Sequence, residues 1–308
     1  SKAVLVDEDG TWRVDPDHEA LRSARKAVRE EINRRRRLGD RSPSPAEVAV
    51  RMLQYERRRM ARAETLAKLE RAVVHAVPAG EPRAAALVRV ATGEITTFVG
   101  DEMDALAQRL LQYDFIAAPG VRPLLRALDV EAGARRLAEL GPPQKTLTIE
   151  GHTVELTLQR LIYGCCGLRS APTNPRTLMK QLQAGKVSGV RRRMESDVKS
   201  LYALYRYGRL HGAYRVRFGN GYARIPVPWV DRAEPRLHDL IKHALEAGAV
   251  VEVVAGAAPR WDDPWAESFP CVVMQGERSW ERYLVDASGR VVDDWAVQLA
   301  RLIPVDDQ

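Results

Sequence analysis

The feature that most constrains the fold is a pattern that occurs four times: two short alternating stretches flank a turn ending in glycine, and a helical pattern follows. The turns are Asp9-Gly10, Thr92-Gly93, Glu150-Gly151 and Ser288-Gly289. Alternation at period two around such a pair is typical of β-hairpins. Because hairpin-then-helix is a common local arrangement, we interpret the four units as coincidence more than as an internal repeat.

Two long helices are expected after the first hairpin. One runs from about Pro16 to Leu38 and ends before Gly39. The second begins at "SPAE", where Ser44 suits the N-cap and Glu47 completes a capping box, and it continues to about Val74. The short link between them predicts an antiparallel helical hairpin.

Breaks at "PAGEPR" and "GPPQK" suggest how the chain is divided. With the main boundary at the second break, residues 1–140 form a helix-rich basic domain, with the helical hairpin at about 16–75 and a ββα unit at about 84–140. Residues 141–308 form a mixed α+β domain with a basic helix and hairpin and an acidic C-terminal part. The expected class is therefore α+β, with antiparallel hairpins in both parts.

Charge is unevenly distributed along this chain of 308 residues, whose formal net charge is +7. Residues 21–71 carry 16 basic and 7 acidic side chains, and residues 156–218 carry 13 basic and 2 acidic ones. Residues 219–308 carry 9 basic and 15 acidic ones. Two basic blocks indicate a polyanionic partner, although the acidic part can also neutralise a basic block within the protein.

The second basic block predicts a helix followed by a hairpin. In a helix over 190–206, one stripe holds Val190, Met194, Val198, Leu201, Leu204 and Tyr205, while Arg192, Lys199 and Arg206 line the opposite side. The next strand alternates tyrosine or other apolar residues with arginine, and Asn220-Gly221 is a strong turn signal. Arginine on phosphate and tyrosine on bases are typical of sequence-tolerant strand binding.

These patterns lead us to expect a non-enzymatic protein that binds DNA or RNA by backbone charge and stacking, as one component of a larger nucleoprotein assembly. An ordinary solvated helix face with tyrosines in the core is the alternative for the same residues. The expected contacts are Arg34, Arg35, Arg36, Arg37, Arg57, Arg58, Arg59, Arg176, Lys180, Lys186, Arg191, Arg192, Arg193, Lys199, Arg206, Arg209, Arg215, Arg217, Arg224, Tyr207, Tyr214 and Tyr222.

Two other functions remain open. A metal-dependent nuclease would need converging carboxylates on Mg²⁺, and the candidates are Asp262, Asp263, Glu267 and Glu277. Otherwise no cofactor is expected, since no GxxxxGK[ST] or GxGxxG phosphate loop is present. An assembly protein whose basic blocks bind acidic protein surfaces is the third hypothesis.

The chain has neither an apolar run of membrane-spanning length nor a signal-peptide pattern, and its three cysteines suggest no disulfide framework. A cytoplasmic location and no membrane partner are expected. The stretch "YARIPVPWVDRAEPRLHDLIKHALEAGAVVEVVAG" reads as strand, helix, strand and resembles the C-terminal half of phospholipase-D-like nucleases. The HxKxxxxD signature of that family is missing, so its activity is not carried over to this chain. The strand–helix–strand pattern predicts a βαβ unit that packs against the core.

Overall fold

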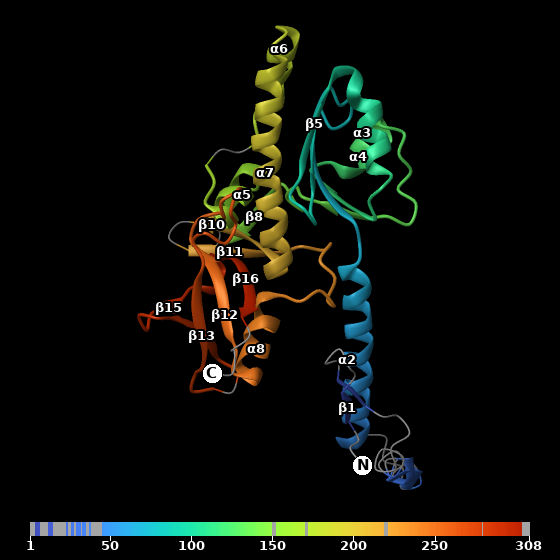
Figure 1. Cartoon of the computed structure of the whole chain (residues 1–308), viewed down its shortest axis with the longest axis vertical. Coiled ribbons are helices and arrows are strands. Elements are labelled where there is room, and N and C mark those ends of the chain that lie inside the picture. Colours follow the sequence, from blue (N-terminus) through green and yellow to red (C-terminus); the bar gives the residue numbers. More distant parts are fainter. Residues whose placement is uncertain are drawn as a thin grey trace. The chain divides into compact units, whose positions relative to one another are not determined.

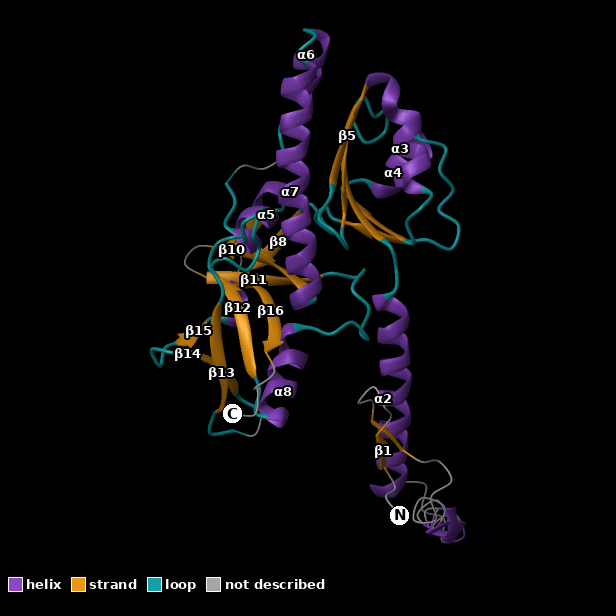
Figure 2. Cartoon of the chain, in the orientation of Figure 1, coloured by secondary structure: helices purple, strands orange, loops and turns teal. Residues whose placement is uncertain are grey.

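The computed structural model describes residues 4–6, 12–14, 23, 26–27, 29–31, 33–34, 37, 45–149, 152–169, 172–218, 221–278 and 280–303. The chain divides into two compact units, Ser1–Glu64 (unit 1) and Thr65–Gln308 (unit 2). Helices and antiparallel hairpins occur together, which confirms the α+β class (Figures 1 and 2).

Unit 1 contains the first predicted hairpin, formed by β1 (Val4–Val6) and β2 (Trp12–Val14). The residues described between positions 23 and 37 are helical. Helix α2 (Pro45–Ala67) follows and runs past the end of the unit. The prediction that it continues to Val74 is wrong, because strand β3 begins at Arg71.

Strand β3 (Arg71–Val77) was missed because all seven of its residues are buried. A strand covered on both faces loses the alternation that distinguishes it from a helix. It lies at the centre of a five-stranded sheet. In spatial order the strands are β5 (Ile95–Val99), β4 (Ala84–Arg89), β3, β6 (Phe115–Ala118) and β7 (Arg136–Glu139).

Both faces of this sheet are covered by helices. One face, including Ala72 and Val74, packs against α3 (Met103–Leu110) and α4 (Val121–Ala127), which follow the 3₁₀ turn η1 (Gly100–Glu102). The other face, including Val73, packs against the 25-residue helix α7 (Val187–His211). Figure 1 shows α7 and the α3–α4 pair on opposite sides of β5.

Helix α7 joins the sheet to the rest of unit 2. The same core contains residues of the sheet, of α5 (Leu158–Cys166) and of α6 (Pro175–Gln183). The predicted division at 140/141 therefore differs from the observed units, since residues on both sides of it share this core. Two hairpins also lie here: β8 (Thr146–Ile149) with β9 (His152–Glu155), and β10 (Ala213–Phe218) with β11 (Gly221–Pro226).

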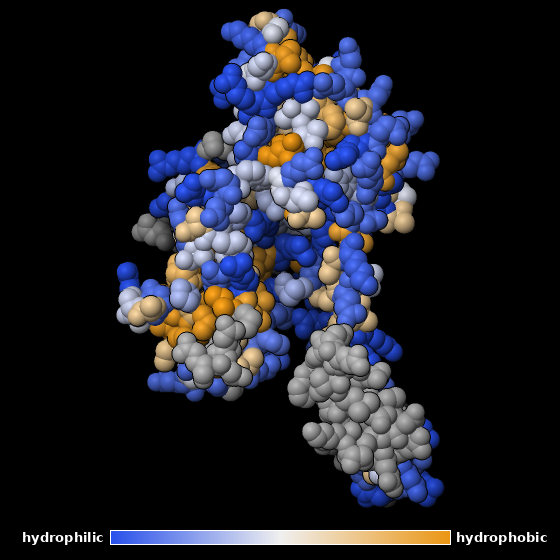
Figure 3. All heavy atoms as spheres, viewed as in Figure 1, coloured by the Kyte–Doolittle hydropathy of each residue, from blue (hydrophilic) through white to orange (hydrophobic). Residues whose placement is uncertain are grey.

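A second five-stranded sheet is antiparallel throughout, and α8 (Leu237–Ala247) packs on one of its faces. On the other face Val272, Met274, Tyr283 and Val291 are exposed, and the orange patch over β13 in Figure 3 lies here. In spatial order the strands are β15 (Val291–Val292), β14 (Arg282–Asp286), β13 (Phe269–Gln275), β12 (Val250–Ala255) and β16 (Val297–Ile303).

Two sequence predictions fail in this region. The last hairpin is followed by the 3₁₀ turn η2 (Asp294–Ala296) and strand β16 rather than by a helix. Asp293 caps η2 by accepting from the Trp295 backbone N–H at 3.0 Å. The predicted βαβ unit is also wrong, because β11 pairs with β10 while β12 lies in the other sheet. The short connection between β10 and β11 determines where β11 pairs.

No helix in the described part of the chain combines the length and the apolar composition that crossing a membrane requires.

Candidate nucleic-acid interface

The predicted two-faced helix is α7. Its apolar stripe is buried completely at Val190, Met194, Val198, Leu201, Leu204 and Tyr205. On the opposite side Arg192 is exposed, and Lys199 and Arg206 are partly exposed. The core therefore orients α7, and its polar side faces the loops of unit 2.

Three neighbouring hollows lie in this part of unit 2, and α7 lines two of them. The central hollow, of about 550 Å³, is lined by α7, the β4–β5 turn and the β12–β13 loop. The α6 hollow is lined by the turn before α6 and by the first part of α7, and it shares Ser196 with the central hollow. The hairpin hollow lies between α5, β10 and η2, and it shares Gln298 with the central hollow.

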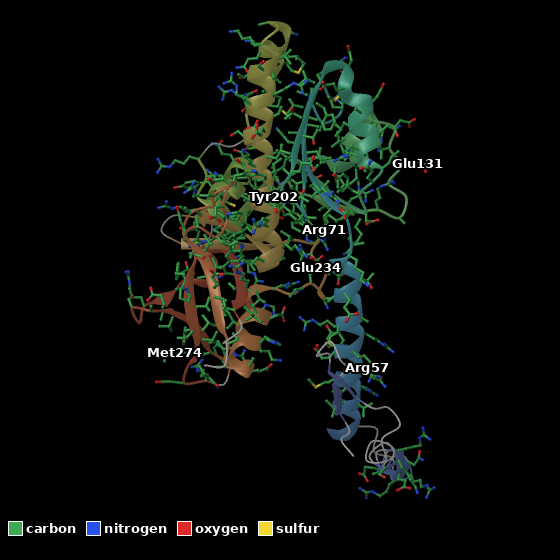
Figure 4. All side chains as sticks on the ribbon, viewed as in Figure 1. Arg57, Arg71, Glu131, Tyr202, Glu234 and Met274 are labelled. Atoms are coloured by element: carbon green, nitrogen blue, oxygen red, sulfur yellow. The ribbon has the colours of Figure 1, made fainter. Side chains whose placement is uncertain are left out.

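The central hollow brings two aromatic rings and three cations together. The ring centroids of Tyr202 and Trp261 are 5.5 Å apart, at an interplanar angle of 68°. The Lys199 ammonium lies 5.2 Å from the Trp261 centroid, and the Arg206 guanidinium lies 5.4 Å from that of Tyr202. The third cation is Arg260. Figure 4 shows Tyr202 on α7, within unit 2.

The charges of these three cations are satisfied differently. Lys199 Nζ lies 2.7 Å from Glu195 Oε1, and Arg260 Nη2 lies 2.7 Å from Asp262 Oδ2. Arg206 has no carboxylate partner within the described part of the chain. Burial lowers the pKa of its guanidinium. A half-buried arginine without an acidic partner is a favourable contact for an anionic ligand.

The hairpin hollow repeats this combination of arginine and aromatic ring. The Arg215 guanidinium lies 3.3 Å from the Tyr222 centroid and 3.4 Å from Asp293 Oδ2. The Arg224 guanidinium lies 5.2 Å from the ring of Trp295, which lines the hollow. Tyr222 is 52% exposed, so its ring is open to stacking.

In the α6 hollow, Arg192 and Arg193 lie on the same wall as Asp197. Asp197 Oδ2 accepts from the Thr173 backbone N–H at 2.9 Å, and Oδ1 accepts from the Thr173 hydroxyl at 3.2 Å. Burial raises the pKa of Asp197. Across the three hollows, eight cationic side chains and three aspartates contribute to the lining, which therefore has an excess of positive charge.

Two of the predicted stacking residues cannot stack on a base. Tyr207 and Tyr214 are buried, and the Tyr207 hydroxyl donates to the Trp295 carbonyl at 2.9 Å. The Tyr214 ring packs toward Trp229, with centroids 6.5 Å apart. The prediction is wrong for both because the core extends beyond the α7 stripe and also takes up the inner face of β10.

Arg191 and Arg209 are engaged with side chains and carbonyls that fix α7. Arg191 donates to the Thr97 carbonyl at 2.8 Å and pairs with Glu102 at 2.7 Å. Arg209 Nε donates to Glu234 Oε2 at 2.5 Å. Both side chains help to hold α7 in place, so they are poorer candidates for nucleic-acid contact than Arg192 or Arg217.

The remaining predicted cations lie elsewhere. Arg176 and Lys180 on α6 and Lys186 at the start of α7 are exposed. The other seven belong to unit 1. Of these, Arg34 pairs with Glu31 at 2.8 Å, and Arg59 lies 3.4 Å from Glu56. Arg37, Arg57 and Arg58 are exposed, and Arg35 and Arg36 are outside the described residues.

Two of the predicted nuclease carboxylates have partners within their own loop, and the other two are exposed. Asp262 pairs with Arg260, and Asp263 Oδ1 accepts from the Trp265 backbone N–H at 3.2 Å, as in an Asx turn. Glu267 and Glu277 are exposed. In the described ranges, no group of three or more His, Cys, Asp or Glu side chains is placed to hold a metal ion.

Sequence reasoning missed Trp261, Trp295, Arg260 and Arg169. The stretch "RWDDPW" was considered only for its acids, although an arginine directly before a tryptophan was a usable signal. The approach of this segment to α7 depends on the path of the β12–β13 loop, and no local sequence pattern indicates that path.

Comparisons with protein-family models, curated proteins and solved structures found no match to this chain.

Proposed function

We propose that this protein binds nucleic acid along the central, α6 and hairpin hollows. The observation that carries the proposal is the pairing of a cation with an aromatic ring at four places: Lys199 with Trp261, Arg206 with Tyr202, Arg215 with Tyr222 and Arg224 with Trp295. Phosphates contact the cations, and bases stack on the exposed parts of the rings.

The same proposal includes membership of a larger nucleoprotein assembly and a cytoplasmic location. Support for the location comes from Cys165, Cys166 and Cys271, all of which are buried free thiols. An assembly role on acidic protein surfaces would use the positive charge but would not require exposed rings beside the cations.

The test is fluorescence anisotropy of labelled single-stranded DNA, duplex DNA and RNA across a salt series. We expect log K to fall linearly with log salt concentration, because bound cations displace counterions from the phosphates. Replacing Arg192 and Arg217 by Gln should weaken binding and reduce the slope on a single strand by about 1.4, at roughly 0.7 per phosphate contact.

The matched control replaces Arg122 and Arg126 by Gln. Both are exposed on α4, across the first sheet from α7, and their replacement removes the same charge. This variant should bind like the wild-type protein. The proposal would be contradicted if the Arg192/Arg217 and Arg122/Arg126 double variants lost the same nucleic-acid affinity. It would also be contradicted if the wild-type protein did not bind at about 0.15 M salt.

A further inference from the structure

The central hollow has a size and an enclosure that suit one flat ligand. The β4–β5 turn, α7 and the β12–β13 loop surround it on three sides. Its volume of about 550 Å³ lies within the range of about 300–1,000 Å³ that is usual for small-molecule sites. A single nucleotide fits these dimensions, whereas a stacked and paired duplex does not.

Its aromatic residues provide a stacking surface. Tyr202 and Trp261 meet edge to face and are only partly buried. The Tyr202 hydroxyl donates to the Val90 carbonyl at 3.4 Å, which ties the ring to the β4–β5 turn. Two rings fixed in a cleft offer an unpaired base the contact that single-strand-binding proteins use, since every base has a π face.

Its cations provide a phosphate contact. Because Lys199 and Arg260 already have carboxylate partners at 2.7 Å, Arg206 is the cation of this hollow whose charge an incoming phosphate would satisfy. The guanidinium lies over the Tyr202 ring, so a phosphate bound to it leaves the attached base close to both rings. Arginine presents a planar fork of donors that suits such an anion.

From this arrangement we infer that the central hollow takes one unstacked base of a nucleic-acid strand, with its phosphate on Arg206, and that the protein therefore prefers single strands to duplexes. This inference rests on the proposed function and makes it more specific. A base in a duplex offers neither a free face nor a free edge, because it is stacked and paired, and extracting it costs a few kcal/mol.

The experiment measures binding of the full chain to four labelled or competing ligands: a single strand, its duplex, an abasic strand with the same number of phosphates, and a free nucleoside monophosphate. The single strand should bind about tenfold more tightly than the abasic strand, since stacking contributes about 1–3 kcal/mol per base. Replacing Ala203, which lines the hollow on α7, by Met should abolish this difference.

Two further variants test the details. Arg206→Gln should weaken binding of the base-containing and abasic strands alike, because it removes a phosphate contact. The control for the filling substitution is Ala105→Met, at an exposed position of α3, which should leave the tenfold difference intact. Thermal melting of each variant verifies that it is folded.

Failure of the inference differs from failure of the proposed function. Equal affinity for the single, abasic and duplex ligands, unchanged in Ala203→Met, would overturn the inference while nucleic-acid binding stands. If a free nucleoside monophosphate bound as tightly as the single strand, this result would contradict the inference that the ligand of the central hollow is a nucleic-acid strand. Absence of salt-dependent binding to every strand would remove the proposed function and the inference together.

Discussion

Glu234 illustrates how single residues hold unit 2 together. Its carboxylate is 2% exposed and accepts from Arg209 Nε at 2.5 Å, while Arg71, 4% exposed, lies 3.4 Å away. Arg71 also donates to the Tyr205 hydroxyl at 3.1 Å and to the Leu66 carbonyl at 2.7 Å. Figure 4 shows Arg71 and Glu234 close together. Burial raises the pKa of Tyr205, so its hydroxyl stays neutral.

Replacement of Glu234 by Gln should lower the free energy of unfolding by about 3–5 kcal/mol, because the buried Arg71 guanidinium loses its counter-charge. Urea denaturation measures the change. The matched substitution Glu277→Gln, at an exposed position, should alter stability by no more than about 0.5 kcal/mol. Equal free energies of unfolding for the two variants would show that a group other than Glu234 balances the buried charge of Arg71.

The contact of α5 with β10 shows what determines packing at the scale of elements. A Cβ atom at Gly164 would lie 2.2 Å from the Arg215 carbonyl oxygen. The neighbouring Cys165 sulfur accepts from the Arg215 backbone N–H at 3.1 Å. Helix and strand therefore approach to a distance that only glycine permits, and this approach sets one wall of the hairpin hollow.

Gly164→Ala should destabilise the protein by about 1–3 kcal/mol, because the backbone of β10 must move to admit the methyl group. Gly189→Ala provides the matched control, since Gly189 is also helical but has no neighbouring atom within 4 Å of the added Cβ. There the better helix propensity of Ala should stabilise by up to about 1 kcal/mol. Urea midpoints that shift in the same direction for both variants would contradict this account of the α5–β10 contact.

Buried histidines make the stability of the whole molecule depend on pH. Burial lowers the pKa of His75, on β3, to about 4, and that of His211, on α7, also to about 4. His75 Nε2 faces Asp197 at 3.7 Å, and His211 Nε2 lies 2.8 Å from the Val297 carbonyl with Arg215, Arg224 and Asp293 nearby. The two histidines lie on elements that share the main core.

The unfolded chain takes up these protons near pH 6.5, and the folded protein only near pH 4. Between those values the unfolded state binds more protons, so each histidine lowers stability as pH falls, by about 2 kcal/mol at pH 5. Asp294 opposes this trend, since burial raises its pKa to about 6 and the folded state takes up that proton first. Burial raises the pKa of Asp197 too, so that carboxylate also opposes the trend.

When the pH falls from 8 to 5, the free energy of unfolding of the His211→Gln variant should therefore drop by about 2 kcal/mol less than that of the wild-type protein. Urea denaturation of both proteins at both pH values gives this difference. The effect of the lost packing cancels, because it is the same at each pH. If the difference in stability between the variant and the wild-type protein were the same at pH 8 and at pH 5, His211 would be protonated in the folded state at pH 5.

What the sequence determined by itself was local. The hairpins β1–β2, β4–β5 and β8–β9 were predicted from turn chemistry, and the buried stripe of α7 was predicted from helical periodicity. In each case the signal lies within one contiguous segment, as turn residues in the hairpins and as helical spacing in α7.

Only the tertiary structure decided the rest. Strand β3 is identified by what covers it, since Arg71–Val77 is buried throughout and shows no periodicity. Burial of Tyr207 and Tyr214, and the meeting of Tyr202 with Trp261, depend on segments far apart in the chain. The physical reason is that local periodicity determines which face of an element is apolar, whereas the packing of distant elements determines which polar side chains share a hollow.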